Sequence, residues 1–445
     1  MFVPRTAAGA RRAALLLTVF LFPAGYATLG AVALLGVSLV IAIRRPAAVW
    51  QRTPLDLPLA FLILSASLSA VFSPFPAMAA GATALLALLL VLAFGATAAT
   101  LAQTPGTLLP LLWALSAGSA VAAIWGIILA LVTGAPAHTP AIGYNALGTT
   151  LATGLPLTLG LAVQSRDRSR MLGAAAAAVI LAGLGFTYSR GAWLGGAAGV
   201  LLFIVLLPRR AIRPLLAMLA AVLVAAALAL AGVAGALGQR LGAVAAPGAI
   251  EDRVAMWRAA AAMARDRPLL GSGLNTFGLL YPRYRPADER SSPEQPFAHN
   301  ILLNAAAEGG VLGLAAFLLT LLGAAAQGVR WLRRRDAHDG ERLAAASVLA
   351  AVAALMVHQQ LDGTAISFHI GFGLWLLLAV LAVEGGHAMA VPPALSSAPS
   401  APTPLAVEKS ERDPPEPLQM HVVRQANDAE RDHAGQQHID RGFLV

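Results

Sequence analysis

Long runs of apolar residues follow one another along most of this chain, separated by short polar connections. A helix needs about 20 apolar residues to cross a bilayer. The runs predict twelve spans, at about 13–25, 26–43, 55–72, 77–101, 107–133, 146–163, 171–187, 191–207, 214–235, 300–327, 343–360 and 367–384. The pattern therefore predicts an all-α, polytopic helical membrane protein with about twelve transmembrane helices.

Composition supports this class and excludes several others. Hydrophobic residues make up 58% of the chain and charged residues only 12%, against roughly a quarter charged in soluble domains. The chain has no cysteine, so disulfides and thiolate metal sites are excluded. Its His residues are scattered and no metal-binding spacing occurs, so no metal or other cofactor is expected. The net charge of +9 comes from arginines between spans rather than from a soluble basic patch, so we expect a bilayer and no nucleic acid as partner.

The arginines also predict an orientation. With twelve spans and a cytoplasmic N-terminus, the cytoplasmic connections contain Arg44, Arg45, Arg52, Arg166, Arg168, Arg170, Arg209, Arg210, Arg213, Arg330, Arg333, Arg334, Arg335 and Arg342. The outer connections 73–76, 134–145 and 361–366 then contain no Lys or Arg, as the positive-inside rule requires. Pro23 and Gly25 indicate either a hairpin or a kink between the first two spans. Merging those spans would reverse every later connection, so a hairpin and two cytoplasmic termini are favoured.

One outer connection, at about 236–298, is much longer than the others. Within it, residues 251–266 carry an apolar stripe at helical spacing, and Pro268 should end that helix. Such a helix lies along the membrane surface or caps a cavity. The loop belongs to a predicted transmembrane domain over 1–385, whereas the proline-rich residues 386–445 lack the apolar density for a core and predict a disordered cytoplasmic tail.

Several polar residues fall at the predicted outer ends of spans. Arg190 lies in a very short connection, where a cation is costly unless it reaches the interface or serves a site. His299 and Asn300 open a span that contains Glu308 about two turns later. Asp362, His358 and His369 lie near the outer ends of the last two spans. These residues line one cavity or act only as interfacial and packing residues, and Glu308 in particular could be a local cap.

A set of short motifs in the second half of the chain resembles a known family. The motifs are Ser189-Arg190-Gly191-Ala192, Arg253-x3-Trp257, Pro268-Leu269-Leu270-Gly271-x-Gly273 and His299-Asn300-x7-Glu308-x-Gly310. Together they resemble the O-antigen ligase and O-antigen polymerase family of bacterial integral-membrane glycosyltransferases. The resemblance covers the spans from about 146 to 384.

The resemblance implies a GT-C-like helical fold in the inner membrane, with a periplasmic active site and metal-independent chemistry. A single displacement at the anomeric carbon would make the reaction inverting. The implied donor is a glycan linked to undecaprenyl diphosphate, and the acceptor is a hydroxyl of lipid A core, of a glycan or of a protein. The family's functional arginines match Arg190 and Arg253, and its functional histidine matches His299. Asn300, Arg258 and Tyr281 are the candidate substrate-binding residues.

Arginines that fork onto phosphate oxygens, with an imidazole that can accept a proton, suit transfer of a sugar from a lipid diphosphate. Ligase, polymerase and protein glycosyltransferase remain alternatives within the family. A lipid or polysaccharide transporter is a further alternative, although the chain shows none of the matched repeats typical of transporters. A scaffold of an export complex predicts that substitutions at the three matched residues leave function intact.

Overall fold

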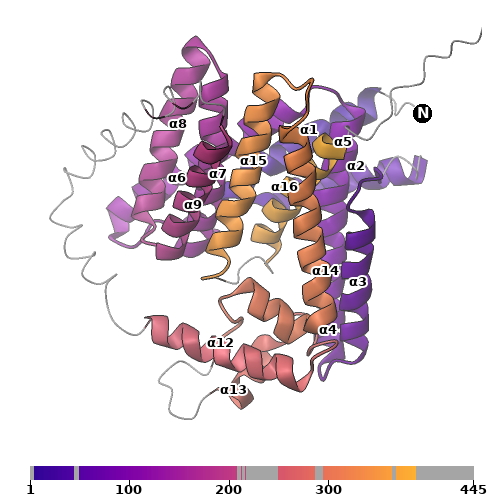
Figure 1. Ribbon diagram of the computed structural model, residues 1–445. Helices are drawn as coiled ribbons and strands as arrows, with labels where there is room; N and C mark the ends of the chain where they lie inside the picture. The colour runs from indigo at the N-terminus through magenta and orange to yellow at the C-terminus, as the bar shows by residue number, and fades with distance from the viewer. Residues whose placement is uncertain are drawn as a thin grey trace, which may run out of the picture. The chain divides into compact units, whose positions relative to one another are not determined.

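The computed structural model describes residues 5–44, 50–207, 212, 216, 249–285, 294–362 and 367–386, and within them it contains helices and connections but no strand (Figure 1). The helices are α1 (Arg5–Leu21), the 3₁₀ turn η1 (Phe22–Ala24), α2 (Ala27–Arg44), α3 (Asp56–Val71), α4 (Pro76–Leu89), the π-helical η3 (Leu90–Gly95), α5 (Ala96–Gln103), α6 (Leu108–Thr133), α7 (Tyr144–Gln164), α8 (Asp167–Phe186), α9 (Arg190–Leu206), α12 (Ala249–Asp266), α13 (Phe277–Tyr284), α14 (Ile301–Leu332), α15 (Asp339–His358) and α16 (Phe368–Gly386).

The prediction of an all-α, polytopic membrane protein is confirmed. Nine helical segments of the described chain are long and apolar enough to cross a membrane, with α4, η3 and α5 together forming one of them, and α3 and α9 are shorter apolar helices. These eleven segments fall on eleven of the predicted spans. The remaining predicted span, 214–235, lies outside the described residues apart from Leu216, so the count of twelve stays a prediction. The predicted tail, 386–445, lies outside them beyond Gly386.

The first two spans are separate helices, as the charge pattern favoured. A 3₁₀ turn follows α1, and Gly25 then adopts a left-handed φ of 93° before α2 begins. A Cβ on Gly25 would lie 2.7 Å from the Cβ of Ala141, so the turn packs tightly on the connection before α7. A side chain at position 25 would meet both the strained backbone and this neighbour, which explains the glycine.

Close helix packing in the centre depends on small residues. Helices α7 and α16 are almost entirely buried, and α15 packs on α7 and α9. A Cβ on Gly195 would lie 2.5 Å from the carbonyl oxygen of Ala354, and one on Gly199 would lie 2.7 Å from the Cβ of Ala354. Glycines four residues apart therefore let α9 approach α15 closely, as is typical of helices packed in a membrane.

Helices α12 and α13, from the long connection between α9 and α14, form a layer across one end of the spans (Figure 1). The helix predicted at 251–266 is present as α12, which ends at Asp266, two residues before Pro268. Helices α12 and α13 share an apolar cluster that includes Met256, Met263 and Phe277, and α12 packs on α14. The hydroxyl of Ser73, after α3, donates to the carbonyl of Ser272, so the α3–α4 connection lies at the same end.

The predicted span 300–327 is not one continuous helix, and this corrects the sequence prediction. Within α14 the backbone leaves the helical region at Gly310 (φ 61°, ψ −163°), which separates 301–309 from 311–332. The N–H groups of Val311 and Leu312 donate to the carbonyls of Pro268 and Leu269, at 2.8 and 3.3 Å. The turn at 268–273 therefore supplies hydrogen bonds that the broken helix lacks, as irregular backbone at membrane depth requires.

Candidate active site

The five residues 358–362, which begin with the last residue of α15 and are here named the 358–362 turn, contact several elements that are distant in sequence. The N–H of Ile301 donates to the carbonyl of Gln359 at 2.9 Å, and the side-chain amide of Asn300 donates to the carbonyl of Gln360 at 3.3 Å. The Nε of Arg253 donates to the carbonyl of Leu361 at 3.0 Å. The turn thus fixes the start of α14 and the first part of α12 against the end of α15.

His299 lies directly against this turn. Its Nδ1 is 3.3 Å from Oδ1 of Asp362, whose side chain is only 3% exposed, whereas the His299 side chain is 20% exposed. The ring of Phe297 flanks the imidazole at a centroid distance of 4.8 Å. His299 also has a left-handed φ of 52°, a conformation that costs a non-glycine residue about 1–3 kcal/mol and that often marks functional positions. The imidazole is therefore held between a buried carboxylate and solvent.

The start of α9, where Arg190 is the first residue, packs on the same turn. Arg190 is exposed, and the Ser189 hydroxyl caps α9 by accepting from the N–H of Ala192. A Cβ on Gly191 would lie 3.2 Å from Cδ2 of His358 and 3.3 Å from Cβ of Leu361. The start of α9 therefore packs on the turn that holds Arg253. A guanidinium at the positive end of a helix dipole is a favourable place for an anion.

His358, one of the additional residues suggested by the sequence, is completely buried. Its Nδ1 lies 2.9 Å from the hydroxyl of Thr149, and that hydroxyl donates to the carbonyl of Asn145. His358 therefore joins α15 to α7 underneath the turn. His369 does not join this group through any contact that we find in the described residues; its ring instead stacks on Phe22 at 4.7 Å.

The three residues predicted to bind substrate have different environments. Asn300 caps α14, since its side-chain oxygen accepts from the N–H groups of Leu302 and Leu303 at 3.1 and 3.0 Å. Arg258 is exposed on α12. Tyr281 is fully buried and its ring stacks on Phe277 at 5.6 Å, which gives it a packing role in the α12–α13 cluster. Substrate binding by these three residues stays a prediction.

Glu308 acts as a local cap, which was one of the two alternatives raised by the sequence. It is 1% exposed, and its Oε1 accepts from the N–H of Phe277 at 2.9 Å at the start of α13. At the other end of α13, the hydroxyl of Tyr284 donates to Oδ2 of Asp266 at 2.7 Å, and this hydrogen bond raises the pKa of Tyr284. Together these bonds fix α13 to α14 and to α12.

The polar groups at the 358–362 turn are the guanidinium of Arg253, the carboxylate of Asp362 and the imidazoles of His299 and the buried His358, and Arg190 is the first residue of the helix that packs on this turn. Two guanidiniums can bind an anionic leaving group, and an imidazole whose Nδ1 faces a carboxylate can accept a proton at Nε2. Among the described residues, no group of three or more His, Cys, Asp or Glu is placed to hold a metal ion.

The 358–362 turn, which brings Arg253, His299 and Asn300 together, was not identified from the sequence. Leu361, Gln360 and Gln359 act through main-chain carbonyls, which any residue supplies, so no side-chain signal pointed to them. Asp362 was recognisable as a polar residue at the outer end of a span, but its pairing with His299 needed the fold.

No curated protein matches this chain in sequence. Residues 175–318 match the model of the family described as O-antigen ligase. The matched stretch begins within α8, continues through α9 and α12, and ends shortly after the break in α14, so it contains Arg190, Arg253 and His299. Over residues 175–318 the match confirms the resemblance to the O-antigen ligase and polymerase family predicted from the motifs.

Proposed function

We propose that this protein transfers a glycan from an undecaprenyl-diphosphate-linked donor to an acceptor hydroxyl, as an O-antigen ligase-type, metal-independent, inverting glycosyltransferase. One observation carries the proposal. Arg253, His299 and the start of α9 with Arg190, which lie far apart in sequence, all meet the 358–362 turn at one end of the membrane helices. The family match supports the general class of glycosyltransferase-like enzyme.

In the proposed reaction, the oxygen of the acceptor hydroxyl attacks the anomeric carbon of the donor sugar. A new carbon–oxygen bond forms while the bond from that carbon to the diphosphate oxygen breaks, and a single displacement of this kind inverts the anomeric configuration. Nε2 of His299 accepts the hydroxyl proton, and the carboxylate of Asp362, with Oδ1 3.3 Å from Nδ1, stabilises the positive charge that the imidazole then carries. Such proton transfer typically contributes about 10²- to 10⁴-fold in rate.

The proposed role of the two arginines is to stabilise the leaving group. The diphosphate leaves with additional negative charge, which Arg190 and Arg253 stabilise. Removal of one well-placed donor to a developing anion costs roughly 2.7–4 kcal/mol elsewhere. Arg253 is suited to this role because its Nε bond to Leu361 fixes the plane of the guanidinium.

The proposed location is the bacterial inner membrane, with the 358–362 turn facing the periplasm and both termini in the cytoplasm. The connections 73–76 and 134–145, which lack Lys and Arg, lie at the same end of the helices as α12 and the turn. Among the described residues, the arginines of the short connections at the other ends of the spans are Arg44, Arg52, Arg166, Arg168, Arg170, Arg330, Arg333, Arg334, Arg335 and Arg342, as the positive-inside rule expects for a cytoplasmic face.

The test is a transfer assay with the purified full-length protein in lipid nanodiscs. An undecaprenyl-diphosphate-linked glycan is incubated separately with lipid A core, with a second lipid-linked glycan and with an acceptor protein, and the products are identified by mass spectrometry. His299→Ala and Arg253→Ala should abolish formation of the product. Arg265→Ala, which removes an exposed arginine from the same helix as Arg253, is the matched control and should retain it. Equal turnover in all variants would refute the proposal.

A further inference from the structure

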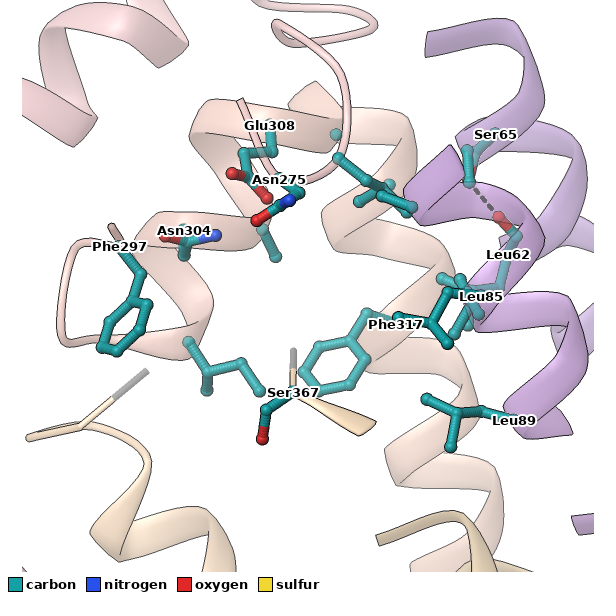
Figure 2. Close-up of a pocket in the computed structure, with 18 of the residues that line it drawn as sticks. Leu62, Ser65, Leu85, Leu89, Asn275, Phe297, Asn304, Glu308, Phe317 and Ser367 are labelled. Carbon is teal, nitrogen blue, oxygen red and sulfur yellow. Dashed lines mark hydrogen bonds between the residues drawn. The ribbon is translucent and has the colours of Figure 1, made fainter. Parts of the chain in front are cut away.

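A pocket of about 610 Å³ lies beside the proposed site, between α3, α4, α14 and α16 (Figure 2). Its volume falls in the range of about 300–1,000 Å³ typical of small-molecule sites. Most of its lining is apolar, including Leu62, Leu85, Leu89, Phe317 and Trp375. A lining of this kind suits a hydrocarbon chain.

One end of the pocket is polar. Figure 2 shows Glu308, Asn275 and Asn304 grouped there, on the first half of α14 and on the turn before α13. Oε1 of Glu308 accepts from Phe277, whereas Oε2 is buried and has no well-aligned hydrogen bond in the part of the chain that the structure describes, although the N–H of Asn275 and the side-chain amide of Asn304 lie near the carboxyl group. A buried oxygen left without a well-placed donor destabilises the folded state. A hydroxyl or amide group in the pocket would supply such a donor.

The charge of the lining limits what can enter. Glu308 is the only ionisable residue among the described residues that line the pocket, and none of them is Lys, Arg or His. A phosphate would therefore face a carboxyl group with no cation beside it. The diphosphate of the proposed donor has its cations at the 358–362 turn instead. The pocket thus selects an uncharged polar group.

The pocket lies between a candidate membrane-spanning helix and the surroundings of His299. Met78 and Leu85 of its lining are 44% and 38% exposed on α4, a membrane-spanning helix, so this wall faces lipid. On the other side, Phe297 lines the pocket and packs against His299 at 4.8 Å. A molecule in the pocket would therefore lie between α4 and Phe297, the residue whose ring packs against His299.

We propose that this pocket binds a membrane amphiphile, with its apolar chain between α4 and α14 and an uncharged, hydroxyl- or amide-bearing group against Glu308 and Asn304. The amphiphile is either the lipid that carries the acceptor hydroxyl or a resident membrane lipid. Its assignment as acceptor rests on the proposed function, whereas binding in the pocket does not.

Photolabelling of the full-length protein in nanodiscs tests the proposal. Three diazirine probes share one chain length: a fatty hydroxyamide, an alkane and an alkyl phosphate. The hydroxyamide should label peptides of α4 and α14 at concentrations about tenfold lower than the alkane does. A tenfold difference corresponds to about 1.4 kcal/mol, which is the expected gain when Oε2 of Glu308 accepts a hydrogen bond from the probe. The alkyl phosphate should label more weakly than the hydroxyamide. Equal labelling by all three probes, or preference for the phosphate, would overturn the proposal.

Two glycines allow the pocket to be filled without disturbing its surroundings. A Cβ on Gly81 would meet no atom within 4 Å, and one on Gly313 would meet only the carbonyl of Ala305 at 4.0 Å. Gly81→Leu and Gly313→Leu should each lower hydroxyamide affinity about tenfold, which corresponds to displacing about two methylene groups of the chain. Gly36→Leu is the matched control, because Gly36 is an exposed helical glycine on α2 with nothing within 4 Å and lies outside the pocket lining. Unchanged labelling in both pocket variants would contradict the proposal.

Transfer kinetics then separate the two sources of the amphiphile. If the acceptor lipid occupies the pocket, Gly81→Leu raises KM for a lipid-borne acceptor but not for the same acceptor sugar without its chain. If a resident lipid occupies it, probe binding falls while both KM values stay unchanged. Binding of the lipid-diphosphate donor to Gly81→Leu is measured in parallel, and Arg253→Ala serves as the variant that is expected to lose donor binding. Loss of donor binding in Gly81→Leu with retained hydroxyamide labelling would show that the pocket serves the donor chain, and would overturn this inference without affecting the proposed function.

Discussion

Substitution of Gly310 by Ala tests the contact that shapes the outer half of α14. Gly310 has φ 61° and ψ −163°, a region that is essentially restricted to glycine and costs other residues about 1–3 kcal/mol. A Cβ there would also lie 2.4 Å from the carbonyl carbon and oxygen of Leu269. Those are backbone atoms, so they cannot rotate away as a flexible side chain could.

The expected loss of stability follows from these two effects. Relief of the clash requires the 268–273 turn to move away, which breaks the bonds from Val311 to Pro268 at 2.8 Å and from Leu312 to Leu269 at 3.3 Å. At about 1 kcal/mol for each hydrogen bond, and about 1–3 kcal/mol for the strain, the total is about 3–5 kcal/mol. That is a large share of the roughly 5–15 kcal/mol by which folded proteins are usually stable.

The assay is thermal unfolding of purified protein in one detergent, followed by tryptophan fluorescence. Gly313→Ala is the matched control on the same helix, since its Cβ would meet nothing nearer than 4.0 Å and alanine favours a helix by about 1 kcal/mol over glycine. We expect a lower Tm for Gly310→Ala and an unchanged or higher Tm for Gly313→Ala. Equal Tm values for the two variants would refute the reasoning, because they would show that the close approach to Leu269 does not exist.

Four further predictions concern the chemistry and the topology. Arg253→Lys should lower kcat/KM by about 10²- to 10³-fold, nearly as much as Arg253→Ala, because an ammonium cannot reproduce a fixed planar guanidinium; near-normal turnover would contradict the assignment. Turnover should persist in excess chelator, whereas strict dependence on a divalent ion would show that metal is required. Cysteines introduced at Ser292 and Ser400 in this cysteine-free chain should differ in their reaction with an impermeant thiol reagent in spheroplasts: position 292 should be labelled and position 400 should not. Labelling at position 400 would contradict the predicted topology. Truncation after Gly386 should leave transfer intact, and loss of activity at normal membrane levels would give the tail a role.

The limits of the membrane helices could be predicted closely because the bilayer itself fixes the length of an apolar run. The span predicted at 107–133 is observed as α6, Leu108–Thr133, and the hairpin at Gly25 followed from the requirement that arginines gather on one side. Both predictions use only information that is local in the sequence or summed over it. Neither prediction depends on which helices are in contact with each other.

The break at Gly310 depends on a contact between distant residues and could not be predicted in this way. The apolar pattern continues through 311–332 without interruption, so hydropathy indicates one span. Gly309 and Gly310 were visible, but glycines in a membrane helix are typical of close helix packing and do not by themselves indicate a break. Only the position of the 268–273 turn, about 40 residues earlier, gives the freed N–H groups their acceptors.

The candidate site shows the same division between local and distant information. Arg190, Arg253 and His299 were recognisable one at a time, as cations and an imidazole at the outer ends of predicted elements. Burial then separates polar residues that looked equivalent: Tyr281 is fully buried in a packing cluster, whereas His299 remains partly exposed beside Asp362. Residue type alone cannot make this distinction, because Tyr and His occur in both environments.

What gathers the site is the main chain of the 358–362 turn. The carbonyls of Gln359, Gln360 and Leu361 accept from three separate residues, and a carbonyl is the same whatever side chain it carries. The geometry is therefore encoded in the length and path of the connection after α15 more than in the identity of these three residues. Asp362 differs from them, since its carboxylate meets His299 directly and no main-chain group can replace it. The proposed chemistry would therefore constrain the side chain of Asp362 and the length of the 358–362 turn, but not the side chains of residues 359–361. A comparison of side-chain motifs accordingly finds Arg190, Arg253 and His299 but not the turn that brings Arg253 and His299 together.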